Sequence, residues 1–218
     1  MASVLERSKK PKASENGKRE PVWDIALIYP MQGDWTEEDY LALERDFGNR
    51  MIELAYGKVE VLPVPSLKHQ RIVKWMLNKV DDFILPQKLG EAAMAPLPVR
   101  LFRGQIREPD IMYFESRRIL DADKRPLDGA DLVMEVPSRG GKNRKRDLQI
   151  KRREYAKAKI PEYWIVDPEE KTITVLTLSG KSYKVHGVFK EGTHATSKLL
   201  KGFKVAVSEV FAAGEGQS

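Results

Sequence analysis

The sequence predicts a mixed α/β protein in which helices pack on a β-sheet. Three observations favour this class. Apolar positions between 67 and 85 recur with helical spacing, and the segments 94–102, 111–114 and 132–136 are short apolar runs typical of strands. A charged helical segment at 147–158 then precedes another strand at 163–166. The order helix, three strands, helix, strand indicates one sheet with helices packed against it.

The N-terminal region predicts a tail followed by two small elements. Residues 1–20 are polar and hold six basic and three acidic side chains, so we expect a disordered basic tail before a single domain over 21–218. Thr36 precedes three acidic residues and an apolar run, which predicts a short helix capped by Thr36. Residues 51–62 alternate in hydropathy around Gly57 and predict a hairpin.

The remaining elements follow from caps and turns. Ser66 is typical of a helix N-cap, and the helix it begins is expected to run to about Leu85. Towards the C-terminus, the segments 172–178 and 183–189 predict a hairpin, and 203–207 predicts a further strand. The alternation in 163–166 places Tyr163 and Trp164 in a core strand rather than on a surface for base stacking.

Positive charge is concentrated in one segment of the chain. The formal net charge is +6, yet residues 139–159 alone contain ten basic and two acidic side chains. A concentrated positive field attracts polyanions, although a solvated helix face is the alternative interpretation. The candidates for contact with a nucleic-acid backbone are Lys142, Arg144, Lys145, Arg146 and Arg152.

Two acidic residues stand out because of their positions in the sequence. Glu135 interrupts the apolar run 132–136, and Asp110 directly precedes the strand that begins at Ile111. A buried carboxylate is unfavourable unless it is paired or binds a metal. If the two strands are neighbours, both carboxylates converge, and oxygen ligands of this kind suit Mg²⁺ or Mn²⁺. Such an ion can activate water and neutralise charge on a phosphate.

A lysine on the following helix is a candidate third member of this group. Asp147, Lys151 and Tyr155 are spaced four residues apart and therefore share one helix face. If the helix folds back onto the sheet, Lys151 can lie over the carboxylates and stabilise charge that develops during a reaction. The alternative is a surface pair of Asp147 and Lys151, with Tyr155 packed on the sheet.

Four segments occur in a characteristic order along the chain. They are Arg107-Glu-Pro-Asp-Ile111, Leu132-Val-Met-Glu-Val-Pro-Ser138, Arg146-Asp-Leu-Gln-Ile-Lys-Arg-Arg-Glu-Tyr155 and Ile160-Pro-Glu-Tyr-Trp-Ile-Val-Asp-Pro168. Together with the hairpin that contains Glu53 and the helix start at 66–70, they resemble the Uma-type restriction endonuclease family. That family belongs to the PD-(D/E)XK nuclease superfamily, and the resemblance covers roughly residues 35–211.

The resemblance implies a restriction-endonuclease-like core in the order αβββαβ, with extra N-terminal and C-terminal hairpins. Asp110 and Glu135 match the catalytic, metal-binding acids of the family, and the carbonyl of Val136 is implied as a further metal ligand. The superfamily's lysine usually follows the second acid by two residues, where this sequence has Pro137. In the Uma-type family the lysine belongs to the next helix, and Lys151 matches it.

Two other positions match motifs of the same family. Glu53 is a candidate to support the metal site, and the alternative is an edge-strand acid that faces water. His69 is likewise a candidate, and its alternative role is capping or packing at the start of a helix. With Asp147 and Tyr155, these residues form the expected support of the site.

The function implied by the resemblance is DNA cleavage that depends on Mg²⁺ or Mn²⁺. The alternative is a catalytically inactive nucleic-acid-binding module of the same fold. A homodimer is a candidate assembly, because enzymes of this fold often act as dimers. The absence of cysteine fits a reducing compartment, and no apolar run approaches the roughly 18 residues of a membrane span, so we expect a cytoplasmic protein without a membrane partner.

Overall fold

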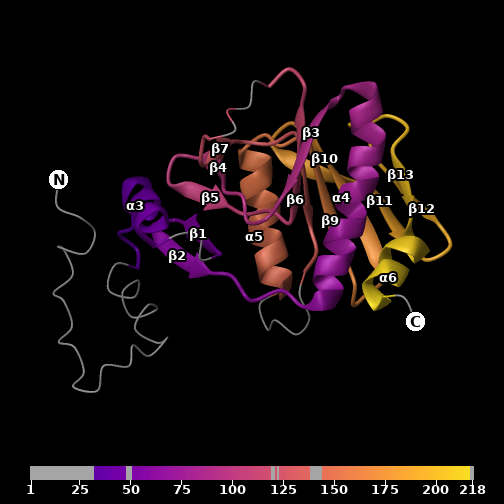
Figure 1. Ribbon diagram of the computed structural model, residues 1–218, viewed down its shortest axis with the longest axis horizontal. Helices are drawn as coiled ribbons and strands as arrows, with labels where there is room; N and C mark the ends of the chain where they lie inside the picture. Colours follow the sequence, from indigo (N-terminus) through magenta and orange to yellow (C-terminus); the bar gives the residue numbers. More distant parts are fainter. Residues whose placement is uncertain (1–31, 48–50, 119–120, 122, 138–143, 217–218) are drawn as a thin grey trace. The chain divides into compact units, whose positions relative to one another are not determined.

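The structure is a computed structural model that describes residues 32–47, 51–118, 121, 123–137 and 144–216. Figure 1 shows the helices and strands coloured along the sequence. The chain divides into two compact units. Unit 1 comprises Met1–Pro63 and Phe102–Arg107, and unit 2 comprises Val64–Leu101 and Glu108–Ser218. The predicted tail over 1–20 lies outside the described residues. A single domain over 21–218 stays a prediction, and each unit is described by itself below.

Unit 1 begins with helix α3 (Glu37–Phe47), whose start is fixed by the predicted cap. The Asp39 backbone N–H donates to Thr36 Oγ1 at 3.1 Å, and the Thr36 N–H donates to Asp39 Oδ2 at 3.2 Å. These two bonds satisfy backbone donors that the first helical turn leaves without partners.

Three short antiparallel strands complete unit 1. Strands β1 (Ile52–Ala55) and β2 (Lys58–Val61) form the predicted hairpin, and β5 (Gln105–Arg107) pairs with the other side of β1. Gly57 has a φ of 73°, a conformation that glycine adopts without strain, and this explains its place in the turn. The core of the unit contains Trp35, Tyr40, Ile52, Leu54, Val59 and Ile106.

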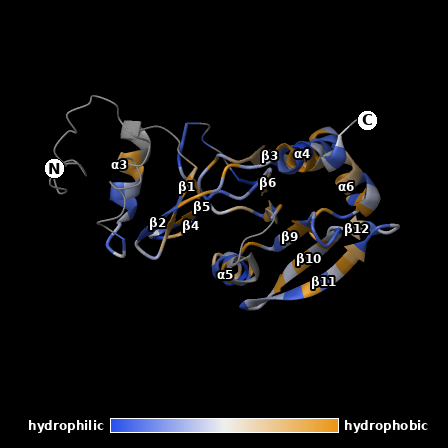
Figure 2. Cartoon of the chain, turned by 90° about the horizontal axis from the view of Figure 1, so that it is seen from below, coloured by the Kyte–Doolittle hydropathy of each residue, from blue (hydrophilic) through white to orange (hydrophobic). Residues whose placement is uncertain are grey.

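Unit 2 is built on a six-stranded sheet in the order β11-β10-β9-β8-β6-β3. The pair β8 and β9 is parallel, and the other neighbours are antiparallel. Hydrophobic and hydrophilic residues alternate along β10 and β11 in Figure 2, as expected for strands with two different faces. The strands are β3 (Gly90–Met94), β6 (Ile111–Glu115), β8 (Leu132–Glu135), β9 (Glu162–Asp167), β10 (Thr172–Ser179) and β11 (Ser182–Lys190).

Two helices pack against the two faces of the sheet. Helix α4 (Leu67–Gln87) is capped by Ser66, whose Oγ accepts from the His69 N–H at 3.2 Å. Its buried residues share one core with Met134 and Trp164, which alternate in their strands with Glu135 and Tyr163. The latter two side chains therefore face the other way, towards helix α5 (Arg144–Lys157).

The core order αβββαβ is confirmed, because α4, β3, β6, β8, α5 and β9 occur in this order with the predicted types, although β4 (Val99–Phe102) and β5 intervene after β3 and β7 (Leu127–Asp128) intervenes after β6. One boundary within it is wrong. The segment 94–102, predicted as one strand, is divided between β3 and β4, and β4 pairs in parallel with β7. Pro96 and Pro98 lie between the two strands, and a proline has no N–H to donate to a sheet.

The C-terminal region contains the predicted hairpin of β10 and β11 and a smaller pair of strands. Strand β12 (His194–Thr196) pairs with β13 (Lys204–Ala206), and helix α6 (Val207–Glu215) follows directly. Helix α6 was not among the elements predicted from the sequence. Ala206 stands at its N-cap and makes no side-chain hydrogen bond, so the usual signal of a helix start is absent.

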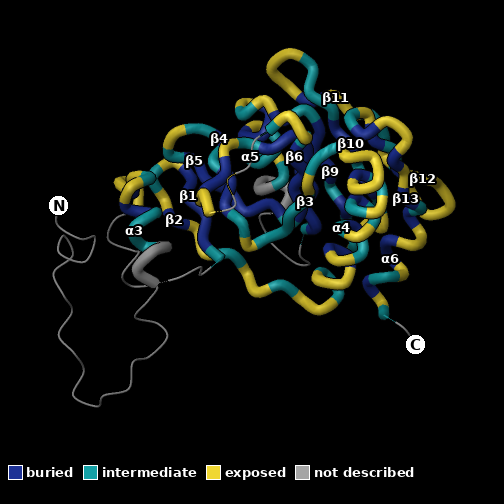
Figure 3. The backbone as a smooth tube through the Cα atoms, turned by 45° about the horizontal axis from the view of Figure 1, so that its top comes forward, coloured by how far each residue is buried: buried dark blue, intermediate teal, exposed yellow. Residues whose placement is uncertain are grey.

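The central strands are almost completely buried (Figure 3). All four residues of β8 and four of the five in β6 are buried, and Tyr163 and Trp164 are 0% exposed, as the core prediction required. Among the described residues, no helix combines the length and the apolar character needed to cross a membrane.

Candidate active site

The two predicted acids meet at one end of the central strands. Ile111 pairs with Met134 in the antiparallel ladder of β6 and β8. One step further along this register, Asp110 lies opposite Glu135. The backbone N–H of Val136 donates to Asp110 Oδ2 at 2.7 Å, and this bond fixes the aspartate at the end of β8. Sequence positions 25 residues apart thus contribute to one site because two strands are neighbours.

Glu135 is a buried carboxylate with strong partners. Its side chain is 9% exposed, and Lys151 Nζ donates to both of its oxygens at 2.9 Å. The hydroxyl of Tyr155 donates to Oε1 as well. These bonds offset the cost of removing the charge from water. They explain how an acid is accommodated inside an apolar strand.

Both donors to Glu135 come from α5. This helix connects the parallel strands β8 and β9, so it must cross back over the sheet. Lys151 and Tyr155 are four residues apart on the helix face that meets the sheet. The Asp147 side chain, the partner of Lys151 in the alternative surface pair, lies outside the described residues. Lys151 pairs with Glu135, and its side chain is only 18% exposed.

His69 contacts the other acid from the first turn of α4. Its Nε2 lies 3.2 Å from Asp110 Oδ1, and its Nδ1 is buried without a hydrogen-bond partner in the described structure. Burial by itself lowers the pKa of His69, but the hydrogen bond and charge of Asp110, with the charge of Glu135, raise the pKa above its ordinary value of 6.5. His69 therefore combines a backbone role in the helix cap with a side chain beside the acids.

Tyr163 is a neighbour of the site that the sequence analysis assigned to the core alone. The parallel register pairs Val133 with Tyr163 and Glu135 with Ile165, so the tyrosine projects from the same face as Glu135. Its ring meets the ring of Tyr155 edge-on at 5.1 Å. Burial, followed by the charge of Glu135, raises the Tyr163 pKa well above 10. Its hydroxyl has no hydrogen-bond partner among the described residues.

The possible metal ligands at this end of the sheet are the two carboxylates and the backbone carbonyl of Val136. No group of three or more His, Asp or Glu side chains forms a complete metal cage within the described ranges. Mg²⁺ is typically held by one or two carboxylates while it keeps several waters, so the donor set fits this hard cation. A cation that requires a full set of protein ligands fits the same donors poorly.

The predicted nucleic-acid contacts are only partly described. Lys142 lies outside the described residues, and so do the side chains of Arg144, Lys145 and Arg146. Arg152 donates to the Tyr183 carbonyl at 2.8 Å, so one of its guanidinium nitrogens holds α5 to β11. The proposed contacts of these residues with a nucleic acid stay predictions.

Glu53 lies in unit 1, and it is not the exposed edge-strand acid considered as an alternative. Its strand β1 lies between β2 and β5, and the residue is 1% exposed. Arg107 Nη1 lies 2.7 Å from Glu53 Oε2 and 2.7 Å from Glu60 Oε2. Glu53 thus belongs to a buried ion pair, and a supporting role in catalysis stays a prediction.

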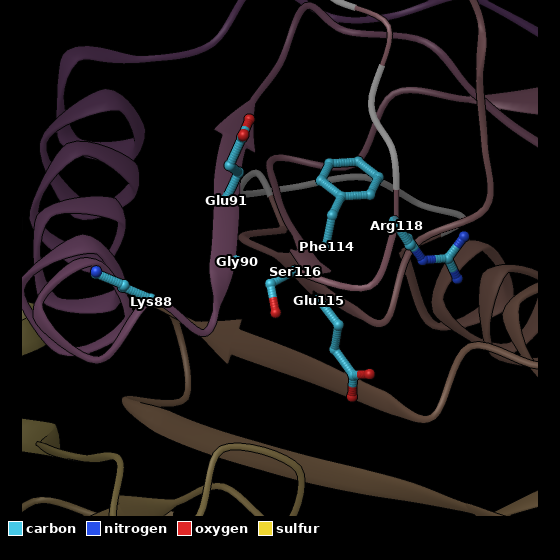
Figure 4. A pocket seen from close by; sticks show the side chains of 7 residues that line it. All are labelled: Lys88, Gly90, Glu91, Phe114, Glu115, Ser116 and Arg118. Atoms are coloured by element: carbon cyan, nitrogen blue, oxygen red, sulfur yellow. The ribbon is translucent and has the colours of Figure 1, made fainter.

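A separate polar cavity lies at the opposite end of β6 from Asp110. It has a volume of about 240 Å³, and Figure 4 shows Lys88, Glu91, Glu115 and Arg118 among its lining residues. Arg118 is committed to Asp131, to which Nε donates at 2.6 Å and Nη2 at 3.1 Å. This cavity contains no member of the predicted site.

The core order, with two acids at the ends of adjacent strands and a lysine above them, places the protein in the class of restriction-endonuclease-like folds. The sequence profile of the Uma2 family, described as "Putative restriction endonuclease", matches residues 37–208. The chain belongs to this family. The family assignment made from the sequence motifs is therefore confirmed.

A solved structure supports the same fold class. The crystal structure of a "putative nuclease" from Anabaena variabilis is similar to the chain with a TM-score of 0.68 and 18% sequence identity. The similarity covers 82% of this chain and 98% of that one. No curated protein matches the chain in sequence.

Proposed function

We propose that the protein is an endonuclease that hydrolyses phosphodiester bonds in DNA with the help of Mg²⁺ or Mn²⁺. The observation that carries this proposal is the arrangement of Asp110 and Glu135, which lie opposite each other at the end of two neighbouring strands. Membership of a family described as restriction endonucleases supports the choice of DNA as substrate.

In this proposal, Asp110, Glu135 and the Val136 carbonyl would hold the divalent ion. A bound ion would supply Lewis-acid stabilisation of phosphate charge and make water a better nucleophile. Water attacks phosphorus in line with the leaving oxygen and gives up a proton to solvent, while the P–O bond to the leaving oxygen breaks and that oxygen takes a proton from solvent. The Lys151 ammonium is suited to stabilise the charge that develops on the phosphate, because its position near Glu135 is shielded from solvent.

Tyr155 and His69 support the two acids in the proposed reaction. Tyr155 donates to Glu135 Oε1 and so limits the rotation of the carboxylate. His69 contacts Asp110 Oδ1, while the Val136 N–H holds Oδ2. Each acid therefore has a protein donor that fixes its direction, as a preorganised site requires.

The test is cleavage of supercoiled plasmid by the wild type and by three variants, with Mg²⁺, with Mn²⁺ and with EDTA. Asp110→Asn and Glu135→Gln keep the size of each side chain and remove its charge. Glu91→Gln removes an acid from β3 of the same sheet, away from the candidate site, and is the matched control. We expect wild type and Glu91→Gln to cut with metal and to stop in EDTA.

For Asp110→Asn and Glu135→Gln we expect a loss of at least about 100-fold in the cleavage rate, because transition-state charge stabilisation is lost. Circular dichroism would check that both variants remain folded. Metal-dependent cutting at wild-type rates by either variant would refute the assigned site. If the wild type binds DNA but never cuts it, the inactive nucleic-acid-binding module becomes the better description.

A further inference from the structure

The Glu135 carboxylate accepts three hydrogen bonds from two side chains of α5. Lys151 Nζ is equidistant from the two oxygens, at 2.9 Å from each, and Tyr155 occupies a further acceptor position on Oε1. A nitrogen equidistant from both oxygens lies in the plane that bisects the carboxylate between them. A cation bound equally to both oxygens would lie in this same plane.

The position of Lys151 therefore has two consequences for a metal. The ammonium pairs with the buried carboxylate of Glu135 and offsets the cost of burying its charge. It also places a positive charge where a divalent ion would approach the carboxylate, and like charges at this range repel strongly in a shielded site. Lys151 and a metal thus compete for Glu135.

We propose that Lys151 is an exchangeable counter-ion of Glu135. It holds the carboxylate in the metal-free protein, gives way when a divalent ion binds, and is then free to turn to the phosphate. This inference rests on the proposed function and adds an order of events to it. Lysine suits the exchange, because its ammonium is a point charge on a flexible four-carbon stem.

Tyr155 differs from Lys151 in this exchange. Its hydroxyl is neutral, so it does not repel a metal, and its ring is fixed by burial and by the edge-on contact with Tyr163. Tyr155 therefore keeps Glu135 oriented while Lys151 leaves. The Tyr155 hydrogen bond to Glu135 is thus permanent, and the Lys151 contact is exchangeable.

The test measures Mn²⁺ binding without DNA, by calorimetry and by the electron paramagnetic resonance of free Mn²⁺, at pH 8. Lys151→Gln removes the charge and keeps a hydrogen-bond donor, and Lys151→Met removes both. Arg153→Gln removes one positive charge from an exposed position of the same helix and is the matched control. Lys151→Arg keeps the competing charge.

We expect Lys151→Gln to bind Mn²⁺ about tenfold more tightly than the wild type, because the competing charge is gone. Lys151→Met should change in the same direction, while Arg153→Gln and Lys151→Arg should stay within about twofold of the wild type. Plasmid cleavage by Lys151→Gln should fall at least about 100-fold despite its tighter metal binding. This opposite movement of affinity and rate is the signature of an exchangeable lysine.

Equal or weaker Mn²⁺ binding by a folded Lys151→Gln protein would overturn the inference and leave the proposed function in place. If neither the wild type nor any variant binds Mn²⁺ at millimolar concentration, both the inference and the metal-dependent function are refuted. Binding by Lys151→Gln alone would support the exchange, because it would show that the lysine blocks the site. Lys151→Gln keeps a donor for Glu135, so it is the variant whose folding is best protected.

Discussion

Two buried tyrosines in ring contact differ in the state of their hydroxyl groups. Tyr155 donates to Glu135 Oε1, whereas the Tyr163 hydroxyl has no partner within the described structure. Both side chains are 0% exposed. A buried hydroxyl without a hydrogen bond costs free energy, while the same group with a charged acceptor is stabilising. Removing each hydroxyl in turn therefore compares what a bonded and an unbonded tyrosine oxygen contribute to the free energy of unfolding.

Tyr163→Phe should raise the free energy of unfolding by about 1 kcal/mol, since it removes a buried group that makes no hydrogen bond. Chemical denaturation followed by tryptophan fluorescence would measure the change. A fall of 1 kcal/mol or more would show that the hydroxyl has a partner, such as an ordered water, in the folded protein.

Tyr155→Phe should have the opposite effect on stability. It removes one donor from the buried carboxylate of Glu135, and we expect a loss of about 1–2 kcal/mol in the free energy of unfolding. The rate of plasmid cleavage should also fall, by roughly tenfold, because Glu135 is less well oriented. With Tyr163→Phe as the control for ring packing, unchanged cleavage by Tyr155→Phe would contradict the orienting role.

At the scale of elements, β9 contains a second buried acid, Glu162, whose hydrogen bonds hold the segment after β12 against the sheet. Glu162 Oε1 accepts from Trp164 Nε1 at 2.7 Å and from Ser197 Oγ at 2.6 Å. Its Oε2 accepts from the backbone N–H groups of Lys198 and Leu199 at 2.7 and 2.9 Å. Four hydrogen bonds thus satisfy this carboxylate, and the connection between β12 and β13 is held to the central sheet.

Glu162→Gln should lower the free energy of unfolding by about 2–3 kcal/mol. An amide has one acceptor oxygen in place of two. Its NH₂ group would therefore point at hydrogen-bond donors that bind a carboxylate oxygen in the wild type, and those donors would lose their acceptor. The midpoint of urea denaturation measures this loss. A change below about 0.5 kcal/mol would mean that the four bonds contribute little to folding.

The elements with local signals were predictable, and the contacts between elements were not. Ser66 predicts a helix start and Gly57 predicts a turn, because capping and a positive φ depend only on residues close in the sequence. Glu135 stood out because it interrupts an apolar run, and Asp110 because it directly precedes a strand. The split at Pro96 could have been predicted from the missing N–H of proline, whereas α6 has no side-chain cap to announce it.

The candidate site shows the same division. The shared helix face of Lys151 and Tyr155 followed from their spacing, but their common partner Glu135 depends on where α5 crosses the sheet. Tyr163 was predicted as a core residue, and it is one. Its position on the face of Glu135 follows only from the parallel register of β8 and β9, which no local pattern specifies.

At the scale of the whole molecule, charge is divided unevenly along the sequence. The tail 1–20 adds six basic and three acidic residues to a chain whose main excess of positive charge lies at 139–159. Binding to a nucleic-acid backbone releases counterions in proportion to the number of phosphates neutralised. The two segments are therefore expected to contribute to the salt dependence of DNA binding.

Deletion of residues 1–20 should reduce the slope of log K against log salt by about 3, because fewer phosphates are neutralised. The pattern of cleavage products should stay the same, since phosphate contacts carry no sequence information. Fluorescence anisotropy with a labelled duplex at several salt concentrations measures the slope. An unchanged slope would exclude the tail from the contact.

The chain passes between its two units three times, because Phe102–Arg107 returns to unit 1 after the start of unit 2. Strand β5 in this return pairs Ile106 with Leu54 and is completely buried. A single junction near Pro63 would therefore separate β1 from β5 and leave β5 in the other half of the chain. Unit 1 is discontinuous in the sequence, so residues 1–63 alone lack one of its strands.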